Sequence, residues 1–351
     1  MSSAKTSHID KQIVSSAEVA NRDNRLDPSR YSRVGEGILR HIELLGLATP
    51  SIGDLPEFVG IYLPNRFTRV YLDDPSYGVP MLGTSSMFMA RLPVDSTIRM
   101  NSKSSALWIK EGDILVSRSG TVGTSVLCGK SYTGHIASDD CFRLRLQETI
   151  RGYVAAYLQS SIGTILLARD SHGKVIRHLK DFDIKRVIVP LIDPNKLKRI
   201  NGLMIDSASL VDDARESLHA CERATNEVLG VPSRKDLRHL WLNCDNGSFV
   251  KSSEMLASSR LDPHFNDPGI DHLRNLFALR KHRALGKIAD VWMPNRFARP
   301  PADSGYGVPF YSSADIMRTR RLPSSTISTR AERYLKQCIV KKGTILICRS
   351  G

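Results

Sequence analysis

The sequence contains an internal repeat, and this repeat constrains the fold more than any other feature. Five short phrases occur twice in the same order, and the two copies of each lie about 230 residues apart. The pairs are RLDP (25–28 and 260–263), PNRF (64–67 and 294–297), YGVP (77–80 and 306–309), RLPVDSTI with RLPSSTI (91–98 and 321–327), and GDILVSRSG with GTILICRSG (112–120 and 343–351). The period is too long for a solenoid. The sequence therefore predicts one complete domain with its connector over residues 10–230, followed by the front half of a second copy.

The second copy has no counterpart to residues 121–230 in this sequence. We therefore expect the chain to be a fragment of a longer parent or a truncated product. A domain that lacks part of its core buries too little apolar surface to be stable alone, so the second copy is expected to be weakly stable.

Composition and cysteine usage point to a cytoplasmic protein. The chain has 351 residues, enough for two domains, and its 41% hydrophobic and 25% charged residues are ordinary for a globular protein. It has no apolar run near the roughly 18 residues of a membrane span, and its N-terminus lacks the apolar core of a secretion signal. The 6 cysteines are scattered without a CxxC pair. We expect reduced thiols, no membrane association and no zinc site.

The charge of the chain favours a polyanionic partner. The formal net charge is +14, and residues 280–349 contain fifteen Lys or Arg against four acidic residues. Basic residues set against phosphates release counterions, so such a face binds nucleic acid in a salt-dependent way. The alternative is a basic surface that serves solubility alone.

The first copy is predicted to mix helices with many short strands. The alternation in residues 113–120 predicts a half-buried strand running into a tight turn, and residues 125–146 predict further strands joined by glycine turns. Helical spacing predicts one helix over Tyr153–Arg169, and residues 182–193 are expected to form a strand closed by Pro190.

A long helix is predicted between the two copies, from Pro194 to Gly230. It would span about 50 Å at 1.5 Å per residue. Either it packs on its own domain as a surface helix, or it forms a coiled-coil strut that needs a partner helix, which we favour because it lies between the repeats. The heptad positions, at alternating three- and four-residue steps, are Leu197, Ile200, Met204, Ser207, Val211, Ala214, Leu218, Cys221, Thr225 and Val228.

Motifs of catalysis fail on spacing or are absent. The stretch Gly129-Lys130-Ser131 resembles the end of a phosphate-binding loop, but the first glycine of that loop would fall on Thr124. The Asp-Pro pairs at Asp27 and Asp262 lack the second proline and aromatic residue of DNA amino-methyltransferases. No HExxH, GxSxG or clustered metal ligands occur, although a nuclease site of scattered acids and a lysine stays open. We expect a binding module with no catalytic residues, no metal and no cofactor.

The repeated phrases carry a resemblance to a known family. The phrase GDILVSRSGTVG at Gly112–Gly123 resembles the strand-turn of type I restriction-modification specificity subunits, in which such a phrase recurs once per target recognition domain. Residues 172–191 are similar to the short helix and final strand of such a domain, and the heptad segment lies where the family places its spacer helix. The second copy departs from the pattern, with Thr344 in place of Asp113 and Cys348 in place of Ser117.

The resemblance implies a fold, a domain organisation and partners. The fold would be α+β (mixed α/β), with two target recognition domains of short strands and helices joined by a long coiled-coil-type helix. Residues 1–193 would form the first domain, 194–230 the spacer helix and 231–351 the second, incomplete domain. The subunit would be non-catalytic and would direct DNA adenine methyltransferase subunits and a helicase-nuclease restriction subunit to a bipartite site on double-stranded DNA.

The candidate DNA contacts are long donors on expected turns. Arg forks onto guanine and Asn onto adenine, but residues shared by both copies are better candidates for structural or phosphate-facing roles than for reading different half-sites. The shared candidates are Asn65, Arg66, Arg69 and Arg118 in the first copy, with Asn295, Arg296 and Arg299 in the second. The other candidates are Lys103, Lys174, Arg177 and His178 in the first copy, with the basic run Arg318, Arg320 and Arg321 in the second.

Two other functions remain as alternatives. The chain could be the recognition part of a longer restriction-modification enzyme whose parent carries the methyltransferase or nuclease. It could also be a basic scaffold or RNA-binding protein, which the aromatic content of 7% disfavours, since single-strand readout relies on stacking.

Overall fold

The structure is a computed structural model of the whole chain. It describes residues 13–348 with the exception of 21–23, 25, 73–76, 94–96, 100–106, 174–176, 233–267, 296, 304, 321, 324 and 332–334. The chain divides into two compact units, which we call unit 1 (Met1–Arg215) and unit 2 (Glu216–Gly351). Within the described ranges, no helix has the length and apolar character needed to cross a membrane.

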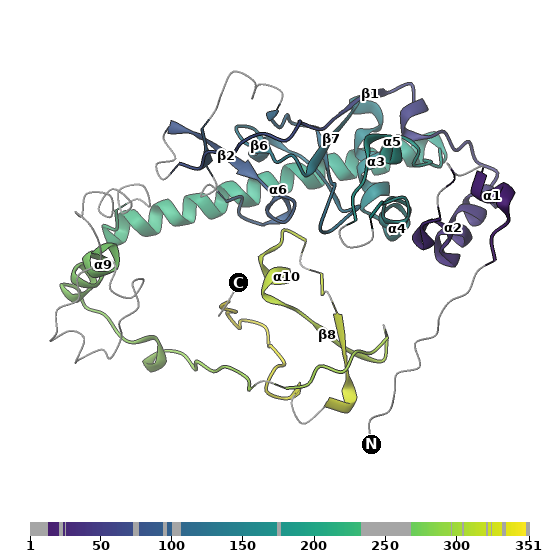
Figure 1. Cartoon of the computed structure of the whole chain (residues 1–351). Helices are drawn as coiled ribbons and strands as arrows, with labels where there is room; N and C mark the ends of the chain where they lie inside the picture. The colour runs from purple at the N-terminus through teal and green to yellow at the C-terminus, as the bar shows by residue number, and fades with distance from the viewer. Residues whose placement is uncertain are drawn as a thin grey trace. The chain divides into compact units, whose positions relative to one another are not determined.

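Unit 1 is α+β and is built on two small sheets. An antiparallel four-stranded sheet has the order β1-β7-β4-β5, and a three-stranded sheet has the order β3-β2-β6. Figure 1 shows α3, α4 and α5 close to the end of the larger sheet, with α6 running past both sheets of this unit. The strands are β1 (Phe58–Tyr62), β2 (Val79–Leu82), β3 (Thr97–Ile98), β4 (Ile114–Ser117), β5 (Ser125–Leu127), β6 (Ile136–Ala137) and β7 (Cys141–Leu146). The helices are α1 (Ser16–Ala20), α2 (Arg33–Leu44), α3 (Glu148–Gln159), α4 (Ser161–Arg169), α5 (Asp181–Lys185) and α6 (Pro194–Leu229).

Strand β4 was expected to be half-buried, and this expectation is wrong. Ile114, Leu115 and Val116 are all 0% exposed. Ile114 and Val116 pack in the larger apolar cluster with α3 and α4, whereas Leu115 packs in a second cluster on the other face of the sheet. Because both faces of the sheet are covered, β4 carries three consecutive apolar residues and does not alternate between apolar and polar ones. The first polar residue of the strand is Ser117.

The single helix expected over Tyr153–Arg169 is two helices in the structure. Ser160 takes an extended conformation between α3 and α4, and its hydroxyl accepts a hydrogen bond from the Gly163 amide at 3.1 Å. This N-cap starts a new helix and changes the direction of the chain. A side chain at Gly163 would lie 2.2 Å from the Tyr157 carbonyl oxygen, so the tight corner requires a glycine there.

The strand expected over residues 182–193 is also wrong. Its first part is the short helix α5, in which the Asp183 carboxylate accepts a hydrogen bond from the Lys180 amide at 2.8 Å. Only isolated bridges follow, from Ile188 to Ser51 and from Leu191 to Ala48. The apolar run therefore packs in the core without joining a sheet.

Helix α6 confirms the predicted long helix and forms a single element of 36 residues. Its first heptad residues, Leu197, Ile200 and Met204, pack against the larger apolar cluster of unit 1. Farther along, Leu218 is 50% exposed and Val228 is 78% exposed. The helix therefore packs on its own unit at its start and presents apolar side chains to solvent toward its end.

Three polar side chains hold α6 against unit 1. The Asn201 side-chain oxygen accepts from the amides of Gly152 and Tyr153, at 2.8 and 3.1 Å. The Asp212 carboxylate accepts from the Lys130 and Ser131 amides, at 2.6 and 3.1 Å. The glycine-lysine-serine stretch that resembles a phosphate loop thus binds an anion of its own chain.

Arg215 is the third anchor of α6 and is only 4% exposed. Its guanidinium donates to the carbonyls of Met89 and Ala90, to the Ser131 hydroxyl and to the Tyr132 hydroxyl, and it lies 4.6 Å from the centre of the Tyr132 ring. Burial raises the pKa of Tyr132 to about 12, so the phenol stays protonated and donates to the Met87 carbonyl at 2.8 Å.

Unit 2 repeats part of unit 1 in the same register. Its described elements include α9 (Pro268–Ala278), β8 (Gly307–Phe310), α10 (Ser313–Met317) and β9 (Ser325–Ser328), and the last part of α6. Strands β8 and β9 pair as β2 and β3 do. The matched pairs are Val79–Ile98 with Val308–Ile327, Pro80–Thr97 with Pro309–Thr326, and the isolated bridges Tyr71–Ile98 with Pro301–Ile327.

The glycine of the repeated YGVP phrase has the same role in both units. A side chain at Gly78 would lie 2.6 Å from the Ile98 carbonyl oxygen, and one at Gly307 would lie 2.4 Å from the Ile327 carbonyl oxygen. The backbones of the paired strands approach too closely for any other residue. The sequence repeat is therefore a repeat of structure.

Candidate nucleic-acid interface

Three segments of unit 1 contact one another, and we call them the turn cluster: residues 117–120, residues 139–140 and the loop 171–179, of which the structure describes 171–173 and 177–179. The first turn follows β4. The Arg118 amide donates to the Asp140 carbonyl at 2.8 Å, and the Arg118 carbonyl accepts from the Leu179 amide at 3.0 Å. The turn expected to follow the repeated GDIL phrase is thus fixed from both sides by backbone hydrogen bonds.

The loop 171–179 is closed at its base by a backbone pair. His172 and His178 each donate an amide hydrogen bond to the other's carbonyl, both at 2.7 Å, and Ser119 bridges to His178. Arg177 is exposed beside this base. Lys174 lies outside the described residues.

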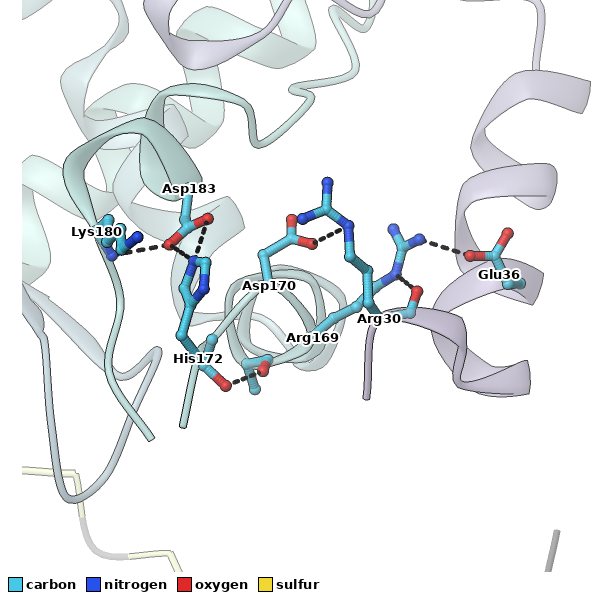
Figure 2. A network of polar contacts seen from close by, with 9 residues as sticks. Arg30, Glu36, Arg169, Asp170, His172, Lys180 and Asp183 are labelled. Carbon is cyan, nitrogen blue, oxygen red and sulfur yellow. Dashed lines mark hydrogen bonds and ion pairs between the residues drawn. The ribbon is translucent and has the colours of Figure 1, made fainter. Parts of the chain in front are cut away.

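One buried carboxylate joins the two ends of this loop. Asp183, 2% exposed, lies 3.0 Å from the His172 ring nitrogen Nε2 and accepts from the Lys180 amide, so it contacts residues before and after the loop. Figure 2 shows the His172 ring and the Lys180 backbone converging on this carboxylate. The position of the loop therefore depends on a side chain that cannot itself touch DNA.

A second set of contacts anchors α2 beside the turn cluster. The Arg169 guanidinium donates to the Arg30 carbonyl at 2.8 Å and to the Glu36 carboxylate at 2.5 Å, and Arg30 lies 3.9 Å from the Asp170 carboxylate (Figure 2). Arg30 stands in the 3-10 turn Pro28–Tyr31, which begins at the repeated Asp-Pro pair. That pair therefore starts a structural turn in unit 1.

The Asp139–Asp140 turn neutralises two of the candidate arginines. Arg69 forms an ion pair with Asp139, while Arg118 lies 3.5 Å from the Asp140 carboxylate, which also accepts from the Ser119 hydroxyl at 2.6 Å. Burial lowers the pKa of Arg69, but its contacts with Tyr71 and Asp139 raise that pKa above the usual value overall. Both guanidinium groups are therefore paired with carboxylates of unit 1, which makes them less available to DNA phosphates.

Three other candidates in unit 1 are exposed to solvent. Asn65, Arg66 and Arg177 are exposed, and within the described ranges neither arginine forms an ion pair. Phe67, from the same repeated phrase as Asn65 and Arg66, packs in the apolar cluster of β2 and β3. The phrase thus combines a core residue with two exposed donors. Lys103 lies outside the described residues.

The candidates of unit 2 do not form one cluster in the described part of the chain. Arg299 is exposed and stacks over the Phe310 ring at 4.7 Å, and Arg318 lies 4.0 Å from the buried Asp315 carboxylate. Asn295 and Arg320 are exposed. Arg296 and Arg321 lie outside the described residues.

Sequence reasoning missed the acids that organise the turn cluster. Asp139 and Asp140 contact side chains 70 and 21 residues away, and Asp183 contacts Lys180 and His172, 3 and 11 residues away, so no short motif marks them. The doublet Asp139-Asp140 just before β7 is the one available signal, because adjacent acids at a strand end often accept from neighbouring turns. Among the described residues, no group of three or more His, Cys, Asp or Glu side chains has the arrangement of a metal site.

Comparisons with known proteins give distant likenesses only. No family model matches the chain, and no curated protein matches it. Three similar solved structures are an HsdS subunit from Thermoanaerobacter tengcongensis (16% identity, 63% of this chain and 53% of that chain, TM-score 0.32), a type I restriction-modification complex studied for its assembly and conformational transition (16%, 60% and 55%, 0.34), and the S subunit from M. genitalium (14%, 59% and 56%, 0.36).

The matches span about half the length of these solved structures, between 53% and 56% of each. Likenesses with such low identities and TM-scores do not establish a function.

Proposed function

We propose that the chain is a non-catalytic specificity subunit of a type I restriction-modification system and binds double-stranded DNA. The observation that carries the proposal is the repeated domain, in which β2–β3 and β8–β9 pair in the same register on either side of the long helix in the sequence. Two similar readers suit a bipartite site, because each reads one half. We propose residues 1–193 and 231–351 as these readers and 194–230 as the spacer.

The helix between the readers would set the spacing of the two half-sites. At 1.5 Å per residue, α6 is about 54 Å long, the length of more than one turn of duplex DNA. Its exposed apolar residues offer a surface to a second helix, as in a coiled coil, and two of them, Leu203 and Leu210, lie one heptad apart. These residues are Leu203, Leu210, Leu218 and Val228, with 59%, 67%, 50% and 78% exposed.

Partners and location follow from the same proposal. DNA adenine methyltransferase subunits would modify the base, and a helicase-nuclease subunit would cut, while this chain selects the site in the cytoplasm. The net charge of +14 supports contact with the DNA backbone. In unit 1 we assign that contact to Arg66 and Arg177, with Asn65 and His178 beside them.

Removal of the two exposed arginines tests this assignment. We expect Arg66→Ala with Arg177→Ala to weaken duplex binding for all sequences alike and to reduce the slope of log affinity against log salt by about 2, because each lost phosphate contact removes about one unit. Fluorescence anisotropy of a labelled duplex over a salt series measures both quantities in the full chain.

The control is Arg223→Ala, which removes one exposed arginine from α6, where Arg223 pairs with Glu216. Its salt slope should equal that of the unaltered chain. An unchanged slope in the double variant, or equal affinity for duplex DNA and RNA of the same length, contradicts the assignment.

A further inference from the structure

The end of β3 and the end of β9 are held by the same backbone contact. In unit 1, the Arg99 amide donates to the Val70 carbonyl at 2.9 Å. In unit 2, the Ser328 amide donates to the Pro300 carbonyl, also at 2.9 Å. The isolated bridges of the next residues match as well, so the two units share this part of the scaffold. Arg99 and Ser328 therefore occupy equivalent positions, directly after the shared strand pair.

The two copies share their sequence before these positions and differ after them. Both carry Ser-Thr-Ile immediately before, at 96–98 and 325–327. From Arg99 to the next shared phrase at Gly112, and from Ser328 to the one at Gly343, the copies differ in sequence and in length. Two readers with one scaffold and different half-sites must differ in the residues that contact bases. Arg99 and Ser328 are the first differing residues after the matched strands.

The Arg99 side chain is presented to solvent by a buried strand. Thr97 and Ile98 are 1% and 2% exposed, whereas Arg99 is exposed. Within the described ranges Arg99 forms no ion pair, in contrast to Arg118, which lies 3.5 Å from the Asp140 carboxylate. The guanidinium of Arg99 is therefore available to a ligand from outside the chain.

We propose that Arg99 reads one base pair of the half-site bound by unit 1, by donating two hydrogen bonds to a guanine. The inference rests on the proposed function and adds to it the residue that selects a base. The planar guanidinium matches O6 and N7 of guanine, and the major groove is wide enough to admit a β-ribbon such as β2–β3. Arg66 and Arg177 would supply affinity through phosphates, and Arg99 would supply sequence preference.

Ser328 gives unit 2 a different preference at the equivalent position. Its side chain is short, uncharged and half-buried, and its hydroxyl accepts from the Arg330 amide at 3.3 Å. A hydroxyl pairs with several bases, so a serine does not require guanine. Unit 2 would therefore tolerate several base pairs where unit 1 requires G·C.

Base preferences of variants at position 99 test the proposal. The full chain first selects its half-site from a random duplex library, and anisotropy then gives its affinity for each base pair at every position. We expect a preference for G·C of at least about fivefold at one position, because a bidentate contact discriminates by that factor or more. Arg99→Ser should lose the preference at that position alone. Arg99→Gln should shift it to A·T, since glutamine pairs bidentately with adenine.

The matched control is Arg40→Ser, because Arg40 is exposed on α2 and the substitution removes the same charge. It should keep every base preference. Unchanged preferences in Arg99→Ser and Arg99→Gln overturn this inference and leave the proposed function standing, and so does a loss of preference spread evenly over all positions. If the unaltered chain selects no half-site, the proposed function fails and the inference fails with it.

Discussion

Replacing Arg215 with alanine is expected to speed hydrogen exchange in residues 208–215 of α6 by at least about a hundredfold. The side chain is 4% exposed and donates to four oxygens of unit 1. Its removal takes these donors from the partly buried carbonyls of Met89 and Ala90. A hydrogen bond from a charged group contributes about 1.5–3 kcal/mol, so the loss of several costs about 3 kcal/mol or more, and each 1.4 kcal/mol is a factor of about ten in the opening equilibrium.

The effect should stay local, which makes exchange measured by mass spectrometry a better readout than global unfolding in a chain of two units. Arg223→Ala is the matched control, because Arg223 lies on the same helix with 66% of its side chain exposed. It should leave exchange in α6 unchanged. Equal exchange rates in Arg215→Ala and the unaltered chain would mean that apolar packing alone holds the helix.

Replacing Asp183 with alanine is expected to weaken duplex DNA binding about tenfold and to destabilise the loop 171–179. The carboxylate is buried and contacts the His172 ring and the Lys180 amide. Its loss removes the acceptor of the Lys180 amide and the contact that positions the His172 ring. The loss of a cap and of a buried acceptor costs about 2–3 kcal/mol in all. Anisotropy gives the affinity, and hydrogen exchange gives the loop.

Asp181→Ala separates geometry from charge in this test. Asp181 lies on the same helix, is exposed and pairs with Lys185. Removing a negative charge alone strengthens attraction to DNA, so Asp181→Ala should bind as well as or slightly better than the unaltered chain. If Asp183→Ala also binds as well, the loop does not contribute to binding.

Local sequence rules identified the elements whose cause lies in nearby residues. The repeat predicted two related units, which share the register of β2–β3 and β8–β9, and heptad spacing between Pro194 and Gly230 predicted α6. The burial of β4 on both faces was not predicted. The second apolar cluster, which covers Leu115, is formed by residues from other parts of the sequence.

Two errors come from local helix caps that the periodicity did not reveal. The split between α3 and α4 depends on the Ser160 cap, and the helix in place of a strand depends on Asp183. Other features depend on contacts between distant residues. The spacing of glycine, lysine and serine excluded a nucleotide-binding loop at Lys130. It did not identify the anion that this stretch binds, because the Lys130 amide donates to Asp212, 82 residues away. Among the site candidates, the acids paired with Arg69 and Arg118 followed no motif.

The most direct test of the proposed function is selection of bound sequences from a random duplex library by the full chain. The proposal predicts that the enriched duplexes share a defined half-site, and that any second half-site occurs at constant spacing from it. Bound duplexes with the same sequence composition as the starting library would contradict the proposal.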